Sequence, residues 1–281
     1  MELTLPQGIR ETVEKALSME PCFDFSSMSE KERMEMQCSW YNQTEGNLAE
    51  FDCPECKNRG YIATAHYDEM FGTWNEVHRP CKCMEIRRLI RRLRQSGLPA
   101  SSAAYEFGTF EASEPWQKAM LSKALDFKGG WFYIGGQSGC GKTHICTAIL
   151  RRMMEEGRSG RYMLWRDEAV KLKSTVTDGY AGQMDEWKNA DVLYIDDLFK
   201  TGKSGDLQRP TPADINLAFE LLNFRAVGRK TTIISSECTL DELIDIDEAI
   251  GGRVAELAKG FCLSIRREKS RNYRLKGMAE L

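Results

Sequence analysis

The sequence predicts an α/β fold in which a parallel sheet of about five strands has helices on both faces. Short apolar runs alternate with helical patterns in the C-terminal part of the chain, and a glycine-rich loop separates the first run from the first helix. Strands that alternate with helices form parallel sheets, because each helix returns the chain to the same edge. The strand-like runs cover residues 131–134, 162–165, 192–195, 231–235 and 262–265.

The glycine-rich loop GQSGCGKT, residues 136–143, fits the G-x4-G-K-T pattern of a phosphate-binding loop. It follows the strand-like run 131–134 and precedes a helical stretch at 144–154, as that pattern requires. Its three glycines allow the backbone to turn successive N–H groups toward phosphate oxygens. We therefore predict a site for ATP or ADP, with Lys142 at the β- and γ-phosphates and Thr143 on Mg²⁺. The predicted nucleotide contacts are Gly136, Gln137, Ser138, Gly139, Cys140, Gly141, Lys142, Thr143 and His144.

Two acids follow the apolar run 192–195 directly, Asp196 and Asp197. Ionised carboxylates at the end of a buried strand need a compensating cation or hydrogen-bond donors. Beside a phosphate-binding loop, the Mg²⁺ of the nucleotide supplies that charge. We predict that Asp196 binds the metal and that Asp197 is the general base that orients the attacking water. The alternative is a strand that only exits into an acidic turn.

A smaller region precedes the α/β domain, since 281 residues exceed the usual domain of about 100–200. We predict an N-terminal region over 1–97 with a metal knuckle at about 50–95, a linker over 98–114, and the α/β domain over 115–281. Glycine, proline and serine mark the linker. It contains an aromatic cluster, Tyr105, Phe107 and Phe110, which could pack beside the base of a nucleotide or form plain core.

Composition and charge restrict the class of protein. The net charge is -3 and the pI is about 5.8, so any contact with nucleic acid must use a local basic surface. The chain has no run of 18 apolar residues, and its N-terminus is too polar for a signal peptide. We therefore expect a cytoplasmic protein without a membrane contact. In that compartment most of the ten cysteines are expected to be thiols or metal ligands.

Four cysteines have the spacing of metal ligands: Cys53, Cys56, Cys81 and Cys83. A C-x2-C pair and a C-x-C pair can form a tetrahedral shell of four thiolates, for which zinc is the expected metal. Residues 60–65 and 73–77 between the pairs predict a β-hairpin. His66 or His78 could replace one thiolate, and an iron–sulfur cluster is an alternative.

A basic helix is predicted directly after the cysteines. Its apolar stripe consists of Ile86, Leu89, Ile90 and Leu93, and Gly97 ends it. The other faces carry Arg87, Arg88, Arg91, Arg92 and Arg94. These arginines either contact nucleic-acid phosphates or an acidic partner, or they form a solvated helix face.

The motifs together resemble a known family. The phosphate loop, the segments VLYIDDL and TTIISSE, and IGGRVAEL occur in the order seen in the AAA+ domain of DnaC/DnaI-type replicative helicase loaders, within the IstB/DnaC-like ATP-binding family. The cysteine knuckle before a basic helix is similar to the N-terminal part of phage members. The resemblance implies a P-loop NTPase (AAA+) fold and a slow, Mg²⁺-dependent ATPase, stimulated by a partner or DNA. Such a protein places the replicative helicase on single-stranded DNA when replication begins.

The resemblance also implies roles for individual residues. Lys142 and Thr143 would be the Walker A pair, Asp196 and Asp197 the Walker B pair, Ser235 or Ser236 the sensor-1 group, and Arg253 the arginine finger that enters a neighbouring subunit's site. Two positions depart from the family pattern. Asp197 stands where many AAA+ proteins have Glu, which implies slow hydrolysis, and Glu237 stands where loaders often have Asn.

The implied partners are a hexameric replicative helicase, single-stranded DNA, and further copies of the chain in a ring or spiral. Basic residues that would follow DNA in a pore, or else form ordinary surface charge, are Lys171, Lys173, Lys200, Lys203 and Arg209. Few residues follow 265, so no helical lid is expected. Arg271, Arg274 and Lys276 are interpreted as a basic tail, with a substitute sensor as the alternative.

Two other functions fit the same residues. An IstB-type transposition ATPase shares the ATPase core but would bind a transposase instead of a helicase. A non-hydrolysing zinc adaptor would keep the phosphate loop only as a structural element. A small-molecule kinase fits less well, because we find no segment that would bind a phosphate acceptor.

Overall fold

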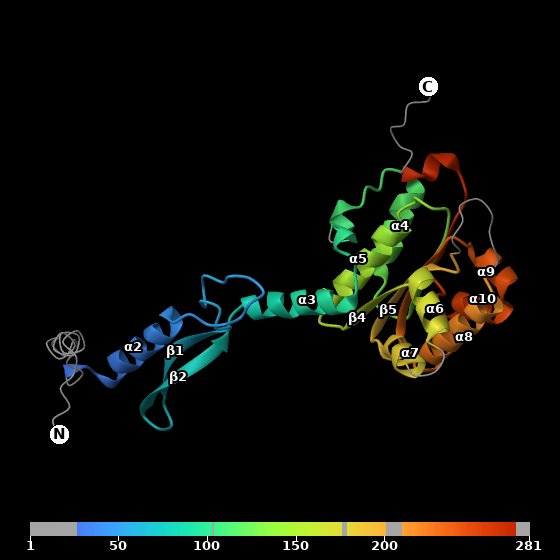
Figure 1. Cartoon of the computed structure of the whole chain (residues 1–281). Helices are drawn as coiled ribbons and strands as arrows, with labels where there is room; N and C mark the ends of the chain where they lie inside the picture. The colour runs from blue at the N-terminus through green and yellow to red at the C-terminus, as the bar shows by residue number, and fades with distance from the viewer. Residues whose placement is uncertain (1–26, 103, 176–178, 201–209, 274–281) are drawn as a thin grey trace, which may run out of the picture. The chain divides into compact units, whose positions relative to one another are not determined.

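The computed structural model describes residues 27–102, 104–175, 179–200 and 210–273. Four basic residues of the sequence predictions, Lys203, Arg209, Arg274 and Lys276, lie outside these ranges. The chain forms two compact units, residues 1–87 and 88–281 (Figure 1). The division falls inside helix α3 (Cys83–Ser96), whereas the boundary predicted at residue 97 coincides with the end of that helix.

The N-terminal unit is built on an antiparallel hairpin of β1 (Tyr61–Asp68) and β2 (Thr73–Pro80). Helix α2 (Glu30–Gln43) begins at a capping box and packs against both strands. Asn42 joins the helix to the hairpin, because its side chain donates to the Ala63 carbonyl at 2.9 Å and accepts from the Ala63 N–H at 2.8 Å. The predicted hairpin is therefore confirmed, with longer strands than the sequence pattern indicated.

The C-terminal unit contains a five-stranded sheet with the order β4-β5-β6-β3-β7, and every neighbouring pair is parallel. The strands are β3 (Trp131–Gly136), β4 (Gly160–Leu164), β5 (Val192–Leu198), β6 (Thr231–Ser236) and β7 (Cys262–Ile265). The predicted α/β class and parallel sheet are confirmed. One predicted strand end is wrong, because Trp165 begins a helix instead of ending β4.

Helices cover both faces of this sheet (Figure 1). They are α4 (Pro115–Asp126), α5 (Lys142–Glu155), α6 (Trp165–Ser174), α7 (Tyr180–Asn189), α8 (Pro212–Val227), α9 (Leu240–Ile246) and α10 (Glu248–Leu257). Along β3, Phe132 and Ile134 pack in one core with α4 and α5, whereas Trp131 and Tyr133 pack in another with α6, α8 and α10. Burial on both faces explains why the strands are apolar at nearly every position.

The parallel sheet determines where a site can form. The carboxyl ends of parallel strands meet at one edge, which places the loop after β3, the acids of β5 and the serines of β6 side by side. In the described ranges, the helices are too short or too polar to cross a membrane.

Candidate functional site

The loop between β3 and α5 has the backbone that phosphate binding requires. Gly136, Gly139 and Gly141 have φ values of 135°, 79° and 89°, which side-chain-bearing residues rarely adopt. Lys142 begins α5, so the partial positive charge of the helix N-terminus faces the loop. Its ammonium group donates to the carbonyls of Gly136 and Gln137, both at 2.8 Å. A cation is therefore held at the loop, ready for phosphate oxygens.

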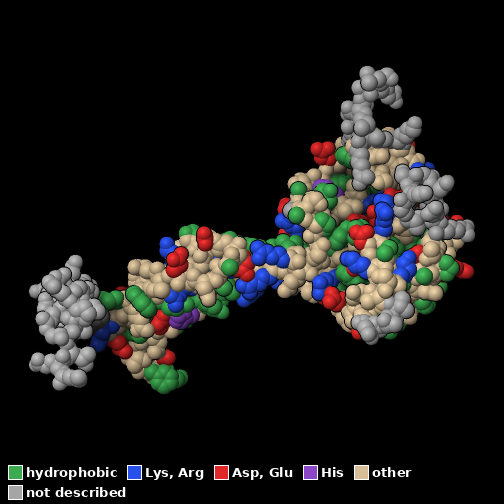
Figure 2. Space-filling view, viewed as in Figure 1, with side chains coloured by type: hydrophobic (Ala, Val, Ile, Leu, Met, Phe, Trp, Pro, Cys, Tyr) green, Lys and Arg blue, Asp and Glu red, His purple; other side chains and the backbone are tan. Residues whose placement is uncertain are grey.

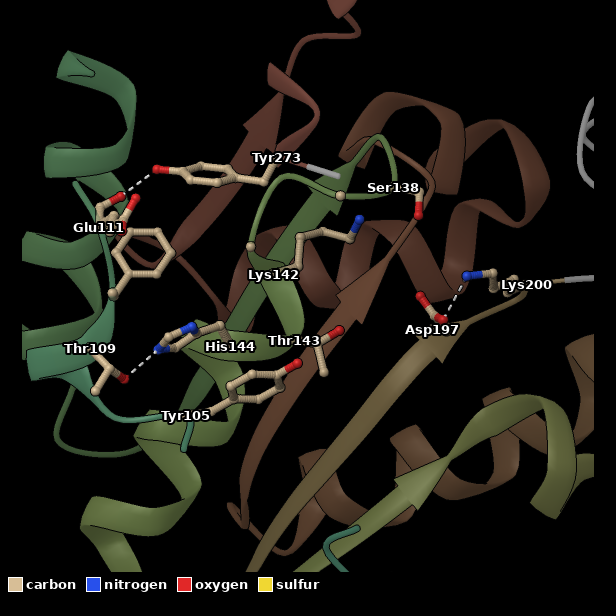
Figure 3. Close-up of a pocket in the computed structure, with 13 residues that line it drawn as sticks. Tyr105, Thr109, Glu111, Ser138, Lys142, Thr143, His144, Asp197, Lys200 and Tyr273 are labelled. Atoms are coloured by element: carbon tan, nitrogen blue, oxygen red, sulfur yellow. Dashed lines mark hydrogen bonds and ion pairs between the residues drawn. The ribbon is translucent and has the colours of Figure 1, made fainter. Parts of the chain in front are cut away.

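A cavity of about 400 Å³ lies against this loop (Figure 3). It is lined by Tyr105, Thr109, Phe110, Glu111, Ser138, Gly139, Gly141, Lys142, Thr143, His144, Asp197, Lys200 and Tyr273. Small-molecule sites have volumes of about 300–1,000 Å³. Among the predicted nucleotide contacts, Gly136, Gln137 and Cys140 do not line the cavity. The Cys140 thiol is buried and donates to the Gln137 carbonyl at 3.0 Å.

Asp196 is held by hydroxyl groups at the edge of the cavity. Its Oδ1 accepts from Tyr194 at 2.6 Å, Ser235 at 2.5 Å and Thr143 at 3.3 Å, and its Oδ2 accepts from Tyr162 at 2.9 Å. These donors offset the cost of a carboxylate that is only 4% exposed. Burial and the neighbouring carboxylate raise the pKa of both tyrosines, which therefore remain protonated donors at neutral pH.

The same contacts bring together the two predicted magnesium ligands. The Thr143 hydroxyl and the Asp196 carboxylate lie 3.3 Å apart at the base of the phosphate loop. Mg²⁺ prefers oxygen ligands and commonly uses one or two protein groups together with substrate phosphates. The residues present therefore fit a magnesium ion.

Asp197 lies in a tight turn beside Asp196 and points into the cavity (Figure 3). Its φ is 56°, and its N–H donates to Ser235 Oγ at 3.1 Å. Its carboxylate accepts from the Lys200 ammonium at 2.8 Å. The sequence predicts Lys200 either as a basic residue that follows DNA or as ordinary surface charge, and the structure instead places it at the nucleotide cavity. The sequence offered one signal for this contact, the spacing of three residues.

The two serines predicted as alternatives for sensor 1 have different surroundings. Ser235 donates to Asp196 and accepts from the Asp197 N–H. Ser236 instead donates to the Leu198 carbonyl at 2.8 Å and accepts from a backbone N–H in the following turn. Only Ser235 thus contacts the acid pair, whereas Ser236 holds the strand ends together.

The predicted linker forms one wall of the cavity instead of a free connection. It contains two short 3-10 turns, η2 (Ala100–Ser102) and η3 (Phe107–Thr109). The ring of Tyr105 stacks on His144 with centroids 4.8 Å apart, and Phe110 meets the same imidazole edge-on at 5.2 Å. Tyr105 and Phe110 line the cavity, whereas Phe107 packs against the adjacent core. Aromatic rings at this place can contact a planar base.

The segment after β7 also reaches the phosphate loop. The Gln137 side chain donates to the Glu268 carbonyl at 2.8 Å and accepts from the Glu268 N–H at 2.6 Å. The Tyr273 N–H donates to the Gly139 carbonyl at 2.9 Å. Arg271 pairs with Glu268 at 2.7 Å. The interpretation of this segment as a basic tail overlooked these contacts, because amide contacts between distant loops leave no sequence pattern.

Arg253 lies on α10 and does not line the cavity. Its guanidinium group sits over the ring of Phe219 from α8, 5.4 Å from the centroid. Its Nη1 is buried without a hydrogen-bond partner among the described residues.

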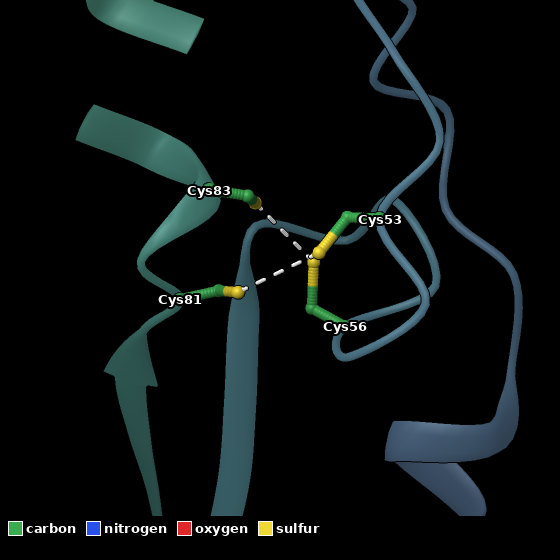
Figure 4. A group of neighbouring side chains, drawn as sticks. All are labelled: Cys53, Cys56, Cys81 and Cys83. Atoms are coloured by element: carbon green, nitrogen blue, oxygen red, sulfur yellow. Dashed lines mark hydrogen bonds between the residues drawn. The ribbon is translucent and has the colours of Figure 1, made fainter. Parts of the chain in front are cut away.

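The four predicted metal ligands converge in the N-terminal unit (Figure 4). The sulfur atoms of Cys53 and Cys81 lie 3.8 Å apart and those of Cys56 and Cys83 lie 3.5 Å apart, and all four lie within 4.8 Å of one another. Thiolates bound tetrahedrally to zinc at about 2.3 Å would be separated by about 3.8 Å. None of the cysteines in the described ranges forms a disulfide.

Local donors favour a thiolate at Cys56, whereas burial raises the pKa of Cys81 and of Cys83. Burial acts to raise the pKa of Cys56, but the Gly60 N–H and the neighbouring thiols outweigh burial and lower that pKa to about 7. The Gly60 N–H lies 3.3 Å from the Cys56 sulfur. The cluster also forms most of the small core of this unit. The residues thus fit a structural zinc ion, which would supply cross-links that the core lacks.

One predicted surface residue of the basic helix is structural instead. Arg87 is fully buried, donates to Glu50 at 3.0 Å and Asn58 at 2.9 Å, and also donates to the Phe51 carbonyl. The prediction that Arg87 lies on a polar helix face is therefore wrong. The helix begins inside the knuckle, where the loop of residues 50–58 covers its first turn.

One family model matches more than half of the chain, and several known proteins are similar to it. A family model described as IstB-like ATP binding protein matches residues 54–250. The uncharacterised protein YqaM of Bacillus subtilis is 26% identical, over 94% of this chain and 98% of its own length. The phage-like element PBSX protein XkdC of the same organism is 27% identical, over 83% of this chain and 90% of its own. A crystal structure of the DnaC helicase loader covers 60% of this chain and 100% of its own at 19% identity, with a TM-score of 0.49.

Proposed function

Because the chain belongs to the IstB-like ATP-binding protein family, we propose that it is a cytoplasmic, Mg²⁺-dependent ATPase that loads a replicative DNA helicase onto single-stranded DNA. The observation that supports the ATPase most strongly is that Lys142 and Thr143 line one cavity and that the Thr143 hydroxyl contacts the buried carboxylate of Asp196. A glycine loop with only a structural role would not require the buried carboxylate of Asp196 beside Thr143.

Residues of this site have two roles in hydrolysis: some bind the nucleotide, and one acts as the base. Lys142 leaves the loop carbonyls to contact the β- and γ-phosphates. Mg²⁺ would be held by Thr143 and Asp196 and would supply positive charge at the phosphate oxygens when bound. Asp197 orients a water and accepts its proton as the water oxygen bonds to the γ-phosphorus. The bond from that phosphorus to the bridging oxygen breaks, and ADP leaves with the electron pair.

The N-terminal unit supplies the surface that we assign to the helicase. Met70 and Phe71 at the tip of the β1–β2 hairpin are 85% and 73% exposed, and Trp40 on α2 is 70% exposed. Large apolar side chains this exposed favour a protein contact when they lie together. Two of them are adjacent at a turn, which suits insertion into an apolar recess of the partner.

We assign the contact with single-stranded DNA to the basic residues of α3. Lys171 and Lys173, predicted for this role, are each ion-paired within the chain at 2.6 Å, to Glu168 and Asp214. Figure 2 shows Lys and Arg side chains gathered over α3. Arg88 and Arg94 are exposed there. Phosphate contacts by such residues would weaken steeply as salt increases.

A loading assay tests the proposal. The intact chain is mixed with the replicative helicase of the same cell and with single-stranded DNA, and helicase bound to DNA is measured with and without ATP. We expect the wild-type chain to increase loading, Lys142→Ala to abolish the effect of ATP, and Met70→Ser with Phe71→Ser to prevent helicase binding while ATP binding persists. No stimulation by the wild-type chain would contradict helicase loading.

The family match also favours a second candidate, an IstB-type transposition ATPase. Both functions require the same ATP site, so the partner distinguishes them. Capture of the intact protein from its native cell should recover the helicase under the first function and a transposase under the second. A non-hydrolysing adaptor would bind ATP without turnover even when DNA and partner are present.

A further inference from the structure

Lys200 lies at the mouth of the phosphate cavity, between two acids. Its ammonium group contacts Asp197 Oδ2 at 2.8 Å and Glu237 Oε1 at 2.9 Å. It lines the same cavity as Lys142 and Thr143. Burial acts to lower the pKa of Lys200, but the hydrogen bonds and charges of the two carboxylates raise it, so the group remains a cation.

The backbone around Lys200 is held in an unusual conformation. Asp197 and Phe199 have φ values of 56° and 62°, a left-handed region that residues with a side chain rarely adopt. Phe199 is buried and meets the ring of Trp165 edge-on at 5.7 Å. The Leu198 carbonyl accepts from Ser236. Core packing and one buried hydrogen bond thus hold a turn that directs Lys200 toward the cavity.

An ordinary ion pair would not need this arrangement. Exposed ion pairs contribute little to stability, which does not offset the cost of two strained residues. The chain offers a comparison in Lys173, which pairs with Asp214 at 2.6 Å and has a side chain 33% exposed, against 32% for Lys200. Lys173 does not line the phosphate cavity. The location of Lys200, and not its exposure, distinguishes it.

We propose that Lys200 is a latch that responds to the γ-phosphate of ATP. Without ATP, the Lys200 ammonium group stays paired with Asp197, so that carboxylate cannot orient the attacking water. When ATP binds, the γ-phosphate oxygens compete with both carboxylates for the ammonium group, and Asp197 becomes free to orient the attacking water. ADP has no γ-phosphate, so Lys200 stays paired with Asp197 and Glu237 when ADP is bound. The inference rests on the proposed ATPase function and adds the residue that distinguishes ATP from ADP.

The test measures the affinities of ADP and of a slowly hydrolysed ATP analogue, both with Mg²⁺, for the full chain. We expect Lys200→Met to lower the affinity for the analogue about tenfold, which is the effect of losing one charge-assisted hydrogen bond. The affinity for ADP should fall less than twofold. Lys200→Arg keeps the cation and should retain the preference for the analogue. Lys173→Met is the matched control and should change neither affinity.

Glu237→Gln tests the latch in the opposite direction. It removes one competing carboxylate but leaves Lys200 in place, so the analogue should bind about threefold tighter or more, with ADP unchanged. An analogue-to-ADP affinity ratio that changes less than threefold in Lys200→Met would overturn the latch. If that variant fails to fold, an unchanged ratio in Glu237→Gln would overturn it.

The outcomes also separate this inference from the proposed ATPase. If the wild-type chain binds neither nucleotide, or if Lys142→Ala binds both normally, the assignment of the nucleotide site is wrong. The role proposed for Lys200 is then wrong as well. If Lys142→Ala loses both nucleotides while Lys200→Met leaves the ratio unchanged, the ATPase stands and only the latch is wrong.

Discussion

At the scale of single residues, the site combines two cations with two acids that have different surroundings. Asp196 accepts four hydroxyl donors, whereas Asp197 accepts from a lysine. The first arrangement holds a buried carboxylate in one orientation, which suits a metal ligand. The second leaves a carboxylate that is released when its cation moves, which suits a base.

We expect Lys142→Ala to lower the affinity for ATP at least about tenfold, equivalent to about 1.4 kcal/mol. The reason is that Lys142 is the cation held directly at the phosphate loop. A nucleotide titration measures the change, and Lys171→Ala, an exposed lysine on α6, is the control. Unchanged affinity would remove the support for the phosphate-binding loop.

Asp197→Asn should separate binding from chemistry. The amide keeps the size of the side chain but cannot accept a proton, so turnover should fall by about 10² or more. ATP with Mg²⁺ should bind at least as tightly as to wild type, because Lys200 loses a competing carboxylate. Turnover is measured at saturating ATP. Wild-type turnover would show that another group positions the water.

At the scale of elements, the two units depend on different sources of stability. The C-terminal unit has two apolar cores on opposite faces of one sheet. The core of the N-terminal unit is formed mainly by four cysteines. A small unit with so little apolar burial needs a cross-link, and metal binding then becomes part of its folding.

Cys53→Ser or Cys83→Ser should therefore release the metal and unfold the knuckle within the N-terminal unit, residues 50–87, while the ATPase unit keeps its structure and its ATP affinity. Metal analysis and limited proteolysis measure the two effects. Cys38→Ser is the control, because Cys38 is buried in the same unit but lies outside the cluster. Protein purified without chelator that contains neither zinc nor iron would contradict the prediction.

At the scale of the whole molecule, Arg253 is the residue for which the family resemblance implies a second copy of the chain. It lies away from its own cavity, stacked on Phe219, with a buried nitrogen that has no partner among the described residues. We expect its guanidinium group to act on the nucleotide of a neighbouring subunit, as the resemblance implies. In the single chain the group lies over the Phe219 ring, 5.4 Å from the centroid.

Arg253→Ala should leave ATP binding intact and abolish stimulated hydrolysis. Mixing it with Lys142→Ala should restore part of the activity, because an intact loop of one chain can meet an intact arginine of the other. Lys259→Ala, an exposed change just beyond α10, is the control. If the two variants assemble together and still fail to hydrolyse ATP, Arg253 acts within its own chain or only structurally.

The sequence by itself determined the features that depend on neighbouring residues. The phosphate loop, the acid pair, the cysteine spacing and the alternation of strands and helices are local patterns, because backbone geometry restricts which residues can occupy them. The family match and the five-stranded parallel sheet confirm what those patterns indicated. The four cysteines with metal-ligand spacing were likewise predicted as a set, and the structure brings their sulfur atoms together.

Only the tertiary structure decided which distant residues meet. Glu237 joins Lys200 because β5 and β6 are neighbours, and Tyr273 reaches Gly139 because β7 lies beside β3. Arg87 resembles the other arginines of its helix, yet contacts with residues 29 to 37 positions earlier in the chain hold it in a buried position. Such contacts depend on strand order and packing, and a local sequence pattern predicts neither of them.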